Sequence, residues 1–146
     1  NLPASALLFP LFVTLPGTSE QVVRTILSID HTSGSMTFAG DIPEGATVRF
    51  MKANFDKITS AAAVAAIDSL ENVKQPDFAL LISCVGRKLM LQSRVEEEVE
   101  AVAEAFQYKT QMAGFYSYGE ISPITHGGTC QLHNQTMTIT TFSEHE

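Results

Sequence analysis

The sequence has no tryptophan, two cysteines and few aromatic or basic side chains, and each shortage excludes a class of protein. Cys84 and Cys130 are too few for a disulfide framework and form no Cys-x-x-Cys motif, which favours a reducing, cytoplasmic setting. Nine Lys and Arg stand against 16 Asp and Glu, a net charge of -7 without basic clusters. We therefore expect no nucleic acid partner. Since no apolar run reaches the roughly 18 residues of a membrane-spanning helix, we also expect no membrane contact.

The length and hydrophobic content are those of one ordinary domain. At 146 residues with 45% hydrophobic content, the chain can bury a core without metals or several disulfides. We therefore predict a single domain over residues 1–146. Its start at Asn1 carries no basic, apolar signal, so we interpret the chain as a fragment of a longer protein.

The first third of the chain has the pattern of β-strands. Residues 6–15 are apolar but contain Pro10, which predicts a bent or edge strand. Three more strands are predicted at Val22–Ile29, Ser35–Ala39 and Thr47–Ala53. Because tight turns join them, we expect an antiparallel meander.

Helical spacing begins after Asn54. The predicted buried face of this first helix is rich in small residues and consists of Ala63, Ala66, Ile67 and Leu70. The helix is expected to end before Pro76. The continuous apolar run Phe78–Cys84 then predicts a central strand that is covered on both faces.

A second helix is predicted from Ser93, which has the spacing of a capping box with Glu96. Its predicted buried stripe is Val95, Val99, Val102, Ala103 and Phe106. The glutamates from Glu96 to Glu104 are interpreted as a solvated face without a functional role. Two strands follow, at Met112–Tyr118 and Leu132–Phe142, separated by a loop.

The predicted elements add up to an α+β domain with the order β-β-β-β-α-β-α-β-β. We expect a mixed, largely antiparallel sheet with two covering helices.

The segment Gly114–Ile121 (GFYSYGEI) is unusual because it holds three aromatics, two glycines and a carboxylate. A glycine in a strand pattern marks a bend or a close backbone approach, so Gly119 is expected to orient Glu120. Tyr116 and Tyr118 are predicted to share a strand face, with Phe115 on the other face in the core. Each tyrosine fits a pocket wall and an ordinary buried ring with a satisfied hydroxyl equally well.

Three segments together resemble the C-terminal domain of the FIST family, the F-box and intracellular signal transduction proteins. They are Ser83–Arg87 (SCVGR), Gly114–Ile121 and Leu132–Thr136 (LHNQT), and the resemblance extends from about Pro10 to Phe142. It implies a cytoplasmic sensory module for signal transduction that binds a small ligand, with amino acids among the candidates. It also implies an N-terminal FIST domain in the same protein and an output partner such as a histidine kinase, a chemoreceptor or a cyclase. The family brings no catalytic residues.

The motif residues suggest how a zwitterion would be held. Cys84 and Arg87 follow the carboxyl end of the predicted central strand, where ligands dock in open α/β sheets. Arg87 suits a ligand carboxylate and Glu120 an ammonium. A salt bridge between Arg87 and Glu120 fits the sequence equally well. The predicted ligand-binding residues are Cys84, Arg87, Tyr116, Tyr118, Glu120, His133 and Asn134.

Two alternatives remain open from the sequence. The first is an enzyme with Cys84 as nucleophile, its thiolate favoured by Arg87, and His133 as base. The second is a protein-interaction module in which the motif only shapes the fold.

The sequence also offers possible zinc ligands. A set of His126, Cys130 and His133 lacks a fourth ligand, and the spacing of Cys130 and His133 in a strand sends them to opposite faces. We therefore expect neither a metal nor a cofactor.

Overall fold

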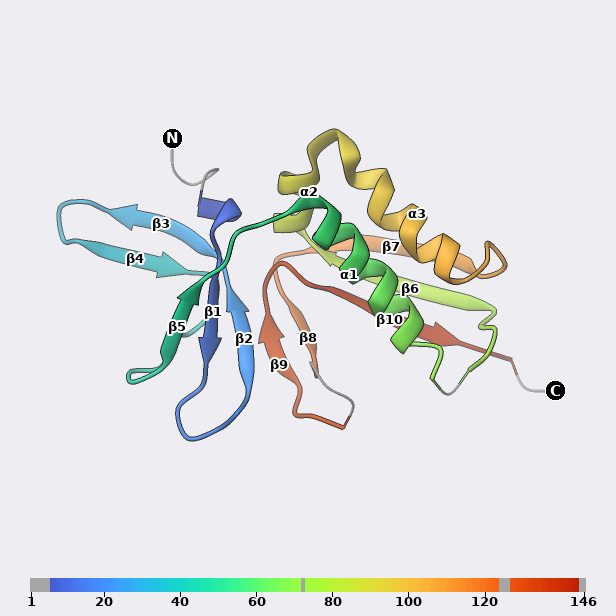
Figure 1. Cartoon of the computed structure of the whole chain (residues 1–146), viewed down its shortest axis with the longest axis horizontal. Coiled ribbons are helices and arrows are strands. Elements are labelled where there is room, and N and C mark those ends of the chain that lie inside the picture. Colours follow the sequence, from blue (N-terminus) through green and yellow to red (C-terminus); the bar gives the residue numbers. More distant parts are fainter. Residues whose placement is uncertain (1–5, 72, 124–126, 145–146) are drawn as a thin grey trace. The chain divides into compact units, whose positions relative to one another are not determined.

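The computed structural model describes residues 6–71, 73–123 and 127–144. The chain forms two compact units (Figure 1). The first unit comprises the residues up to Ala53 together with Tyr118–Thr136, and the second comprises Asn54–Ser117 together with the residues from Met137 onward. The described residues form both helices and strands in antiparallel and mixed sheets, which confirms the predicted α+β class.

The first unit is built of short antiparallel strands. Strand β1 (Leu11–Thr14) lies between β2 (Gln21–Arg24) and β5 (Thr47–Phe50) and is antiparallel to both. Strand β8 (Glu120–Ser122) pairs antiparallel with β9 (Gln131–His133). The core of this unit is formed by Leu11, Val13 and Val22.

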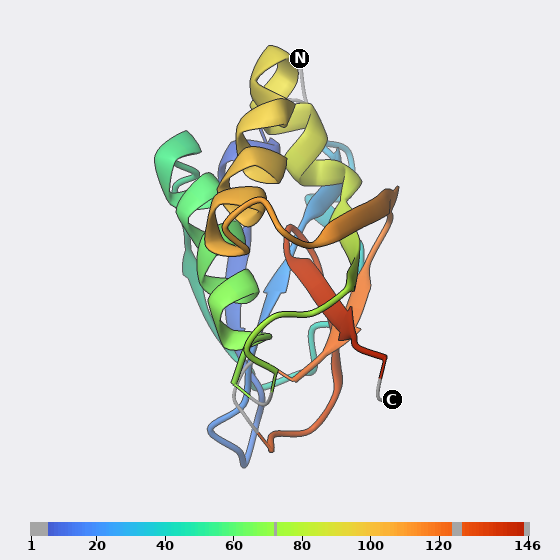
Figure 2. The ribbon, with the colours of Figure 1, turned by 90° about the vertical axis from the view of Figure 1, so that its right-hand side faces the viewer.

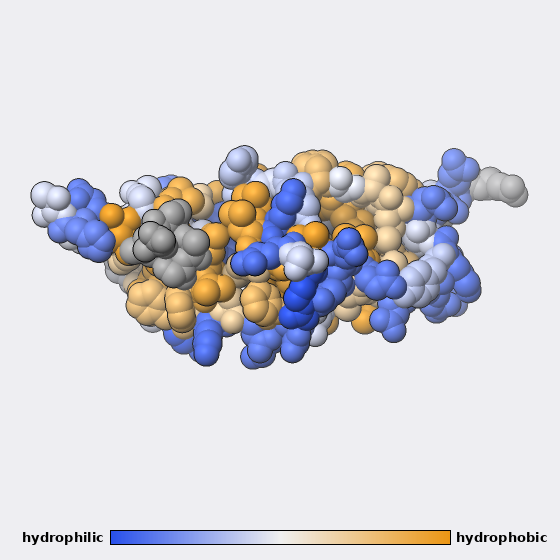
Figure 3. Space-filling view, turned by 90° about the horizontal axis from the view of Figure 1, so that it is seen from above, coloured by the Kyte–Doolittle hydropathy of each residue, from blue (hydrophilic) through white to orange (hydrophobic). Residues whose placement is uncertain are grey.

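A hairpin of β3 (Ile26–Asp30) and β4 (Ser35–Phe38) completes the first unit. In Figure 3 the turn of this hairpin, at the left end of the view, is hydrophilic, and hydrophobic residues follow it. Among the hairpin residues, Leu27 and Met36 are about half exposed. The hairpin therefore contributes to the core mainly where β3 begins and β4 ends, through the buried Ile26 and through Phe38, which packs against the core of the unit.

The predicted meander is wrong in two respects. The expected strand Val22–Ile29 is broken at Thr25, whose N–H donates to the Asn134 side chain instead of to a neighbouring strand. The expected strand Thr47–Ala53 does not continue from β4, because β5 pairs with β1. Before β1 the chain forms a 3-10 turn, η1 (Ala6–Leu8).

The second unit is a mixed sheet with helices on one face (Figure 2). Its central strand β6 (Phe78–Cys84) is antiparallel to β10 (Met137–Phe142) and parallel to β7 (Gln111–Ser117). Helices α1 (Phe55–Asp68) and α3 (Val95–Ala105) pack on this sheet, as predicted for two covering helices. The core consists of Ala62, Ala66, Ala79, Leu81, Val102 and Phe106.

The two faces of β6 differ, so the prediction that both are covered is wrong. Residues Ala79, Leu81 and Ser83 are buried on the helix side, whereas Leu80 and Ile82 are only half-buried. On the same side as Ile82 lies its β7 neighbour Phe115, which is 57% exposed and not a core residue. The apolar run of β6 therefore reflects one covered face and one partly open face.

Helix α1 begins after Asn54 as predicted, and the Asn54 side chain accepts from the Lys57 N–H. Its buried residues are Ile58, Ala62 and Ala66. Of the predicted face, Ala66 is thus buried and Leu70 packs against the core, whereas Ile67 is 58% exposed. A short helix α2 (Val85–Leu91), which the sequence patterns did not predict, follows β6 directly.

The predicted capping box at Ser93 does not form. A 3-10 turn, η2 (Gln92–Arg94), precedes α3, and the N-cap residue of α3 is Arg94, which has no side-chain cap bond. The Arg94 guanidinium instead donates two hydrogen bonds to Glu97, at 2.6 and 2.7 Å.

The last predicted strand, Leu132–Phe142, is two strands. It is interrupted at Gln135, which has a φ of 59° and separates β9 in the first unit from β10 in the second. The Gln135 side chain donates to the Leu7 carbonyl and to the Thr25 hydroxyl. These bonds hold the turn in a conformation that a continuous strand does not have.

Candidate functional site

The predicted ligand-binding residues belong to both units. Cys84, Arg87 and Tyr116 lie in the second unit, and Tyr118, Glu120, His133 and Asn134 lie in the first. Because β7 ends at Ser117, the shared strand face predicted for Tyr116 and Tyr118 does not exist.

The centre of the second-unit site is a buried carboxylate, Glu98 of α3. Its side chain is fully buried and forms an ion pair with Arg87 of α2, with 2.9 Å between Arg87 Nε and Glu98 Oε2. The other carboxylate oxygen accepts from the hydroxyls of Ser83 at 3.1 Å and Tyr116 at 3.2 Å. Arg87 also donates from Nη2 to the Ile58 carbonyl at 2.8 Å. The partner of Arg87 is thus Glu98, which the sequence analysis assigned to a solvated face.

The sheet register explains how these side chains meet. Ser83 and Tyr116 are paired in the parallel register of β6 and β7, so both side chains point to the helix-covered face. Helix α2 begins immediately after β6 and carries Arg87 in its first turn. Helix α3 then crosses the same face with Glu98 directed toward the sheet.

A hollow of about 260 Å³ adjoins Glu98 in the second unit. Its other lining residues are mainly apolar and include Leu81, Val99, Met112, Phe115 and Met137. The Lys88 ammonium lies 4.9 Å from the centre of the Tyr116 ring, which also lines the hollow. The hollow therefore combines mainly apolar walls with a buried anion, and one of its lining rings, that of Tyr116, is in contact with a cation.

The environment of Tyr116 changes its acidity. Burial raises the pKa of the Tyr116 hydroxyl, and the Glu98 carboxylate raises the pKa further, while Arg87 opposes this. Tyr116 is therefore a hydrogen-bond donor at neutral pH, not a phenolate. Cys84 has a side chain that is 4% exposed, at the N-cap position of α2.

In the first unit Glu120 and Asn134 stabilise the chain around β8 and β9. Glu120 is 2% exposed and accepts from the Thr136 hydroxyl at 2.7 Å. Asn134 accepts from the Thr25 N–H at 3.2 Å and donates to the His133 carbonyl at 3.3 Å. Tyr118 is 87% exposed.

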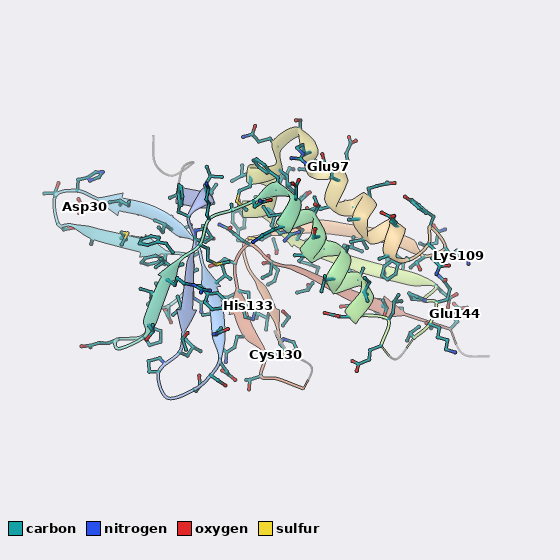
Figure 4. All side chains as sticks on the ribbon, in the orientation of Figure 1. Asp30, Glu97, Lys109, Cys130, His133 and Glu144 are labelled. Atoms are coloured by element: carbon teal, nitrogen blue, oxygen red, sulfur yellow. The ribbon has the colours of Figure 1, made fainter. Side chains whose placement is uncertain are left out.

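His133 is nearly fully buried, with 1% of its surface exposed. Its Nε2 lies 3.0 Å from the Ser122 carbonyl, which can only accept, so Nε2 carries the hydrogen. Burial is the main cause that lowers the pKa of His133, and the positive charge of Arg24 lowers it further, whereas the Ser122 carbonyl and Glu120 act in the opposite direction. Nδ1 is buried without a hydrogen-bond partner among the described residues. Figure 4 labels His133 on β9, with Cys130 just before this strand.

Within the described ranges, no three His, Cys, Asp or Glu side chains are grouped so that they could hold a metal ion. His126 of the considered zinc set lies outside the described residues. In the same ranges, no helix is long and apolar enough to cross a membrane.

Sequence analysis missed Glu98 and Ser83. A signal for Glu98 exists, because it stands three residues after Val95 and four before Val102 and so falls on their helical face. In the structure the buried residues of α3 are Glu98 and Val102, whereas Val99 of the predicted stripe is 42% exposed. A single charged residue within an apolar stripe is thus the pattern that predicts a buried ion pair.

Comparison with known proteins gives a family and distant relatives. The family model described as the FIST C domain matches residues 1–123, which includes the GFYSYGEI segment but not Leu132–Thr136. An uncharacterised protein of Mycobacterium tuberculosis is 27% identical over 133 residues, 89% of this chain and 33% of the relative. One from Mycobacterium bovis is 28% identical over 130 residues, 87% of this chain and 32% of the relative. The chain thus spans about a third of these relatives. No solved structure matches.

Proposed function

We propose, from the premise that this chain belongs to the FIST C domain family, that it senses a small ligand in the hollow beside Glu98. FIST C domains are associated with signal transduction. Amino acids are the ligand class that we propose to test first. The single observation that carries this proposal is the buried carboxylate of Glu98, with both oxygens held by hydrogen bonds, in a mainly apolar hollow.

The buried carboxylate supports an ammonium-bearing ligand. Burying a charge costs several kcal/mol unless partners compensate it, and here Arg87, Ser83 and Tyr116 hold the Glu98 oxygens in place. A ligand in the hollow would have a preorganised acceptor for its ammonium group and apolar walls for its side chain. In this proposal Arg87 acts through Glu98 and does not contact the ligand.

Lys88 supports the other end of a zwitterion. Its ammonium forms a cation–π contact with the Tyr116 ring, and this ring lines the hollow. A ligand carboxylate there would gain a charge-assisted hydrogen bond. Glu98 and Lys88 thus take the roles that the sequence suggested for Glu120 and Arg87.

A sensory domain has to transmit the effect of ligand binding to another domain or to a partner protein. Since the relatives are about three times as long as this chain, we propose that the domain acts together with other domains. The N-terminal FIST domain and an output partner such as a histidine kinase, a chemoreceptor or a cyclase fit this role.

A thermal-shift screen of the whole chain against the protein amino acids and simple amines tests the proposal. A ligand that binds only the folded chain stabilises it by about 2.7 kcal/mol at a free concentration of 100 Kd. We expect at least one amino acid to raise the melting temperature, with Lys88→Met weakening the response to amino acids but not to amines. If no compound shifts the melting temperature at millimolar concentration, the proposal is wrong.

A further inference from the structure

A second hollow lies in the first unit and is independent of the hollow at Glu98. It has a volume of about 340 Å³. Its lining comes from the β1–β2 connection, the segment before β9, and β9 itself: Ser19, Glu20, Gln21, Gly127, Gly128, Thr129, Gln131 and His133.

Two features distinguish this hollow from an ordinary surface depression. The first is His133, whose Nδ1 is buried and has no hydrogen-bond partner among the described residues. Because Nε2 donates to the Ser122 carbonyl, Nδ1 presents a lone pair and acts only as an acceptor. A buried polar atom without a partner lowers the stability of the folded chain, so a donor that reached Nδ1 would remove this cost.

The second feature is the charge of the lining. Glu20 is the charged side chain among the described lining residues, and its Oε2 accepts from Gln131 Nε2 at 2.9 Å. The hydroxyls of Ser19 and Thr129 can also accept. A lining that is rich in acceptors and carries one negative charge favours a ligand with several N–H donors and a positive charge.

We propose that this hollow binds the ammonium group of a small primary amine. In this proposal the three N–H donors of the ammonium go to His133 Nδ1, the Glu20 carboxylate and one lining hydroxyl, since all of these residues line the hollow. A quaternary ammonium has the same charge but no N–H donor, so it cannot satisfy Nδ1. The site is thus selective for primary amines over their fully methylated analogues.

The test is an NMR titration of the folded whole chain that observes the ring nitrogens of His133. Methylammonium chloride is the probe, and tetramethylammonium chloride at the same ionic strength is the matched control. Methylammonium is expected to shift the Nδ1 resonance in a saturable manner, and tetramethylammonium is expected to leave it unchanged. No shift with methylammonium, or equal shifts with both cations, would overturn the inference.

A pair of surface variants provides the second test without disturbing the buried imidazole. Glu20→Gln removes the carboxylate of the hollow and is expected to weaken methylammonium binding about tenfold. Glu44→Gln removes an exposed carboxylate of the same unit that does not line the hollow, and it should titrate like the unaltered chain. Equal affinities for all three proteins would contradict the role of Glu20. Since these readouts involve only the first unit, they are independent of the outcome for the hollow at Glu98.

Discussion

At the scale of single residues, the stability of the second unit depends on the carboxylate of Glu98 and its three hydrogen-bond donors. Glu98 holds residues of β6, α2 and β7 together through Ser83, Arg87 and Tyr116. A buried charge that loses its partner is destabilising by about 3 to 5 kcal/mol, because the remaining charge stays desolvated. Glu98 therefore has a structural role in addition to its proposed one.

Replacement of Glu98 by Gln should lower the free energy of unfolding by about 3 kcal/mol, since Arg87 loses its countercharge in a buried position. Urea denaturation measures this difference. Glu96→Gln changes an exposed glutamate of the same helix and should cost less than about 0.5 kcal/mol. The double replacement Arg87→Met with Glu98→Leu should recover most of the loss. Equal stabilities of the Glu98→Gln and Glu96→Gln variants would show that the ion pair contributes nothing.

His133 should make stability depend on pH. Its pKa is lowered in the folded state, mainly by burial, so the unfolded chain takes up a proton at a higher pH than the folded chain. The stability due to His133 is therefore complete above the unfolded pKa of about 6.5 and is lost as the pH falls toward the folded-state pKa. The slope that His133 causes in a plot of the free energy of unfolding against pH should not exceed about 1.4 kcal/mol per pH unit.

Urea denaturation between pH 7.5 and 5 gives this slope, with the pH values chosen to bracket the ordinary histidine pKa of about 6.5. His133→Gln removes the titrating group and should flatten the slope. The exposed His31, changed to Gln, is the matched control and should leave the slope as it is. An unchanged slope in His133→Gln would contradict the assigned cause.

The two cysteines should differ in reactivity in the order of their exposure. Cys130 is exposed and Cys84 is buried, so iodoacetamide is expected to label Cys130 faster near neutral pH. Mass spectrometry of partly labelled protein gives both rates. An enzyme with Cys84 as nucleophile requires the reverse order, so faster labelling of Cys84 would support that alternative.

At the scale of elements, two glycines of the GFYSYGEI segment permit close approach for different reasons. A Cβ at Gly114 would strike the Leu81 backbone oxygen of the paired strand β6. A Cβ at Gly119 would lie 2.8 Å from Leu132 Cδ1, the end of a flexible side chain. The sequence predicted a bend or a close approach at Gly119, and the strand is indeed broken there, between β7 and β8.

Gly114→Ala should therefore destabilise the chain more than Gly119→Ala. Overpacking against backbone costs about 1 to 3 kcal/mol, whereas a leucine side chain can move aside at lower cost. Thermal or urea unfolding of the two variants checks the order. The account of the β6–β7 contact fails if Gly119→Ala is the less stable of the two.

Local patterns predicted the elements better than their ends. The apolar run of β6, the two long helices and the bend at Gly119 follow from spacing and composition, which act over a few residues. Helix α2 was missed because its 7 residues are too few to give a clear helical pattern. The η2 turn with its positive φ at Gln92 was missed because Ser93 and Glu96 mimic a capping box.

At the scale of the whole molecule, pairing between distant segments was not predictable from the sequence. The pairing of β5 with β1 and the division of Leu132–Phe142 between two units depend on contacts across many residues, which one sequence does not reveal. The same holds for the candidate site. The sequence named Arg87 and Tyr116, but the residue that joins them, Glu98, was hidden in a run of exposed glutamates.

The proposed sensing function depends on access to the hollow at Glu98. Val99 lines this hollow from α3 and is 42% exposed, so Val99→Trp can fill it without replacing a core residue. Val64, which is 54% exposed on α1 and does not line the hollow, allows a matched replacement by Trp. Both variants add the same bulk to a helix surface of the same unit.

The most direct test of the account is the amino acid thermal-shift screen repeated on these two variants. We predict that Val64→Trp keeps the ligand-induced rise in melting temperature and that Val99→Trp loses it. An equal rise in both variants would place the ligand outside the hollow at Glu98 and contradict the central claim.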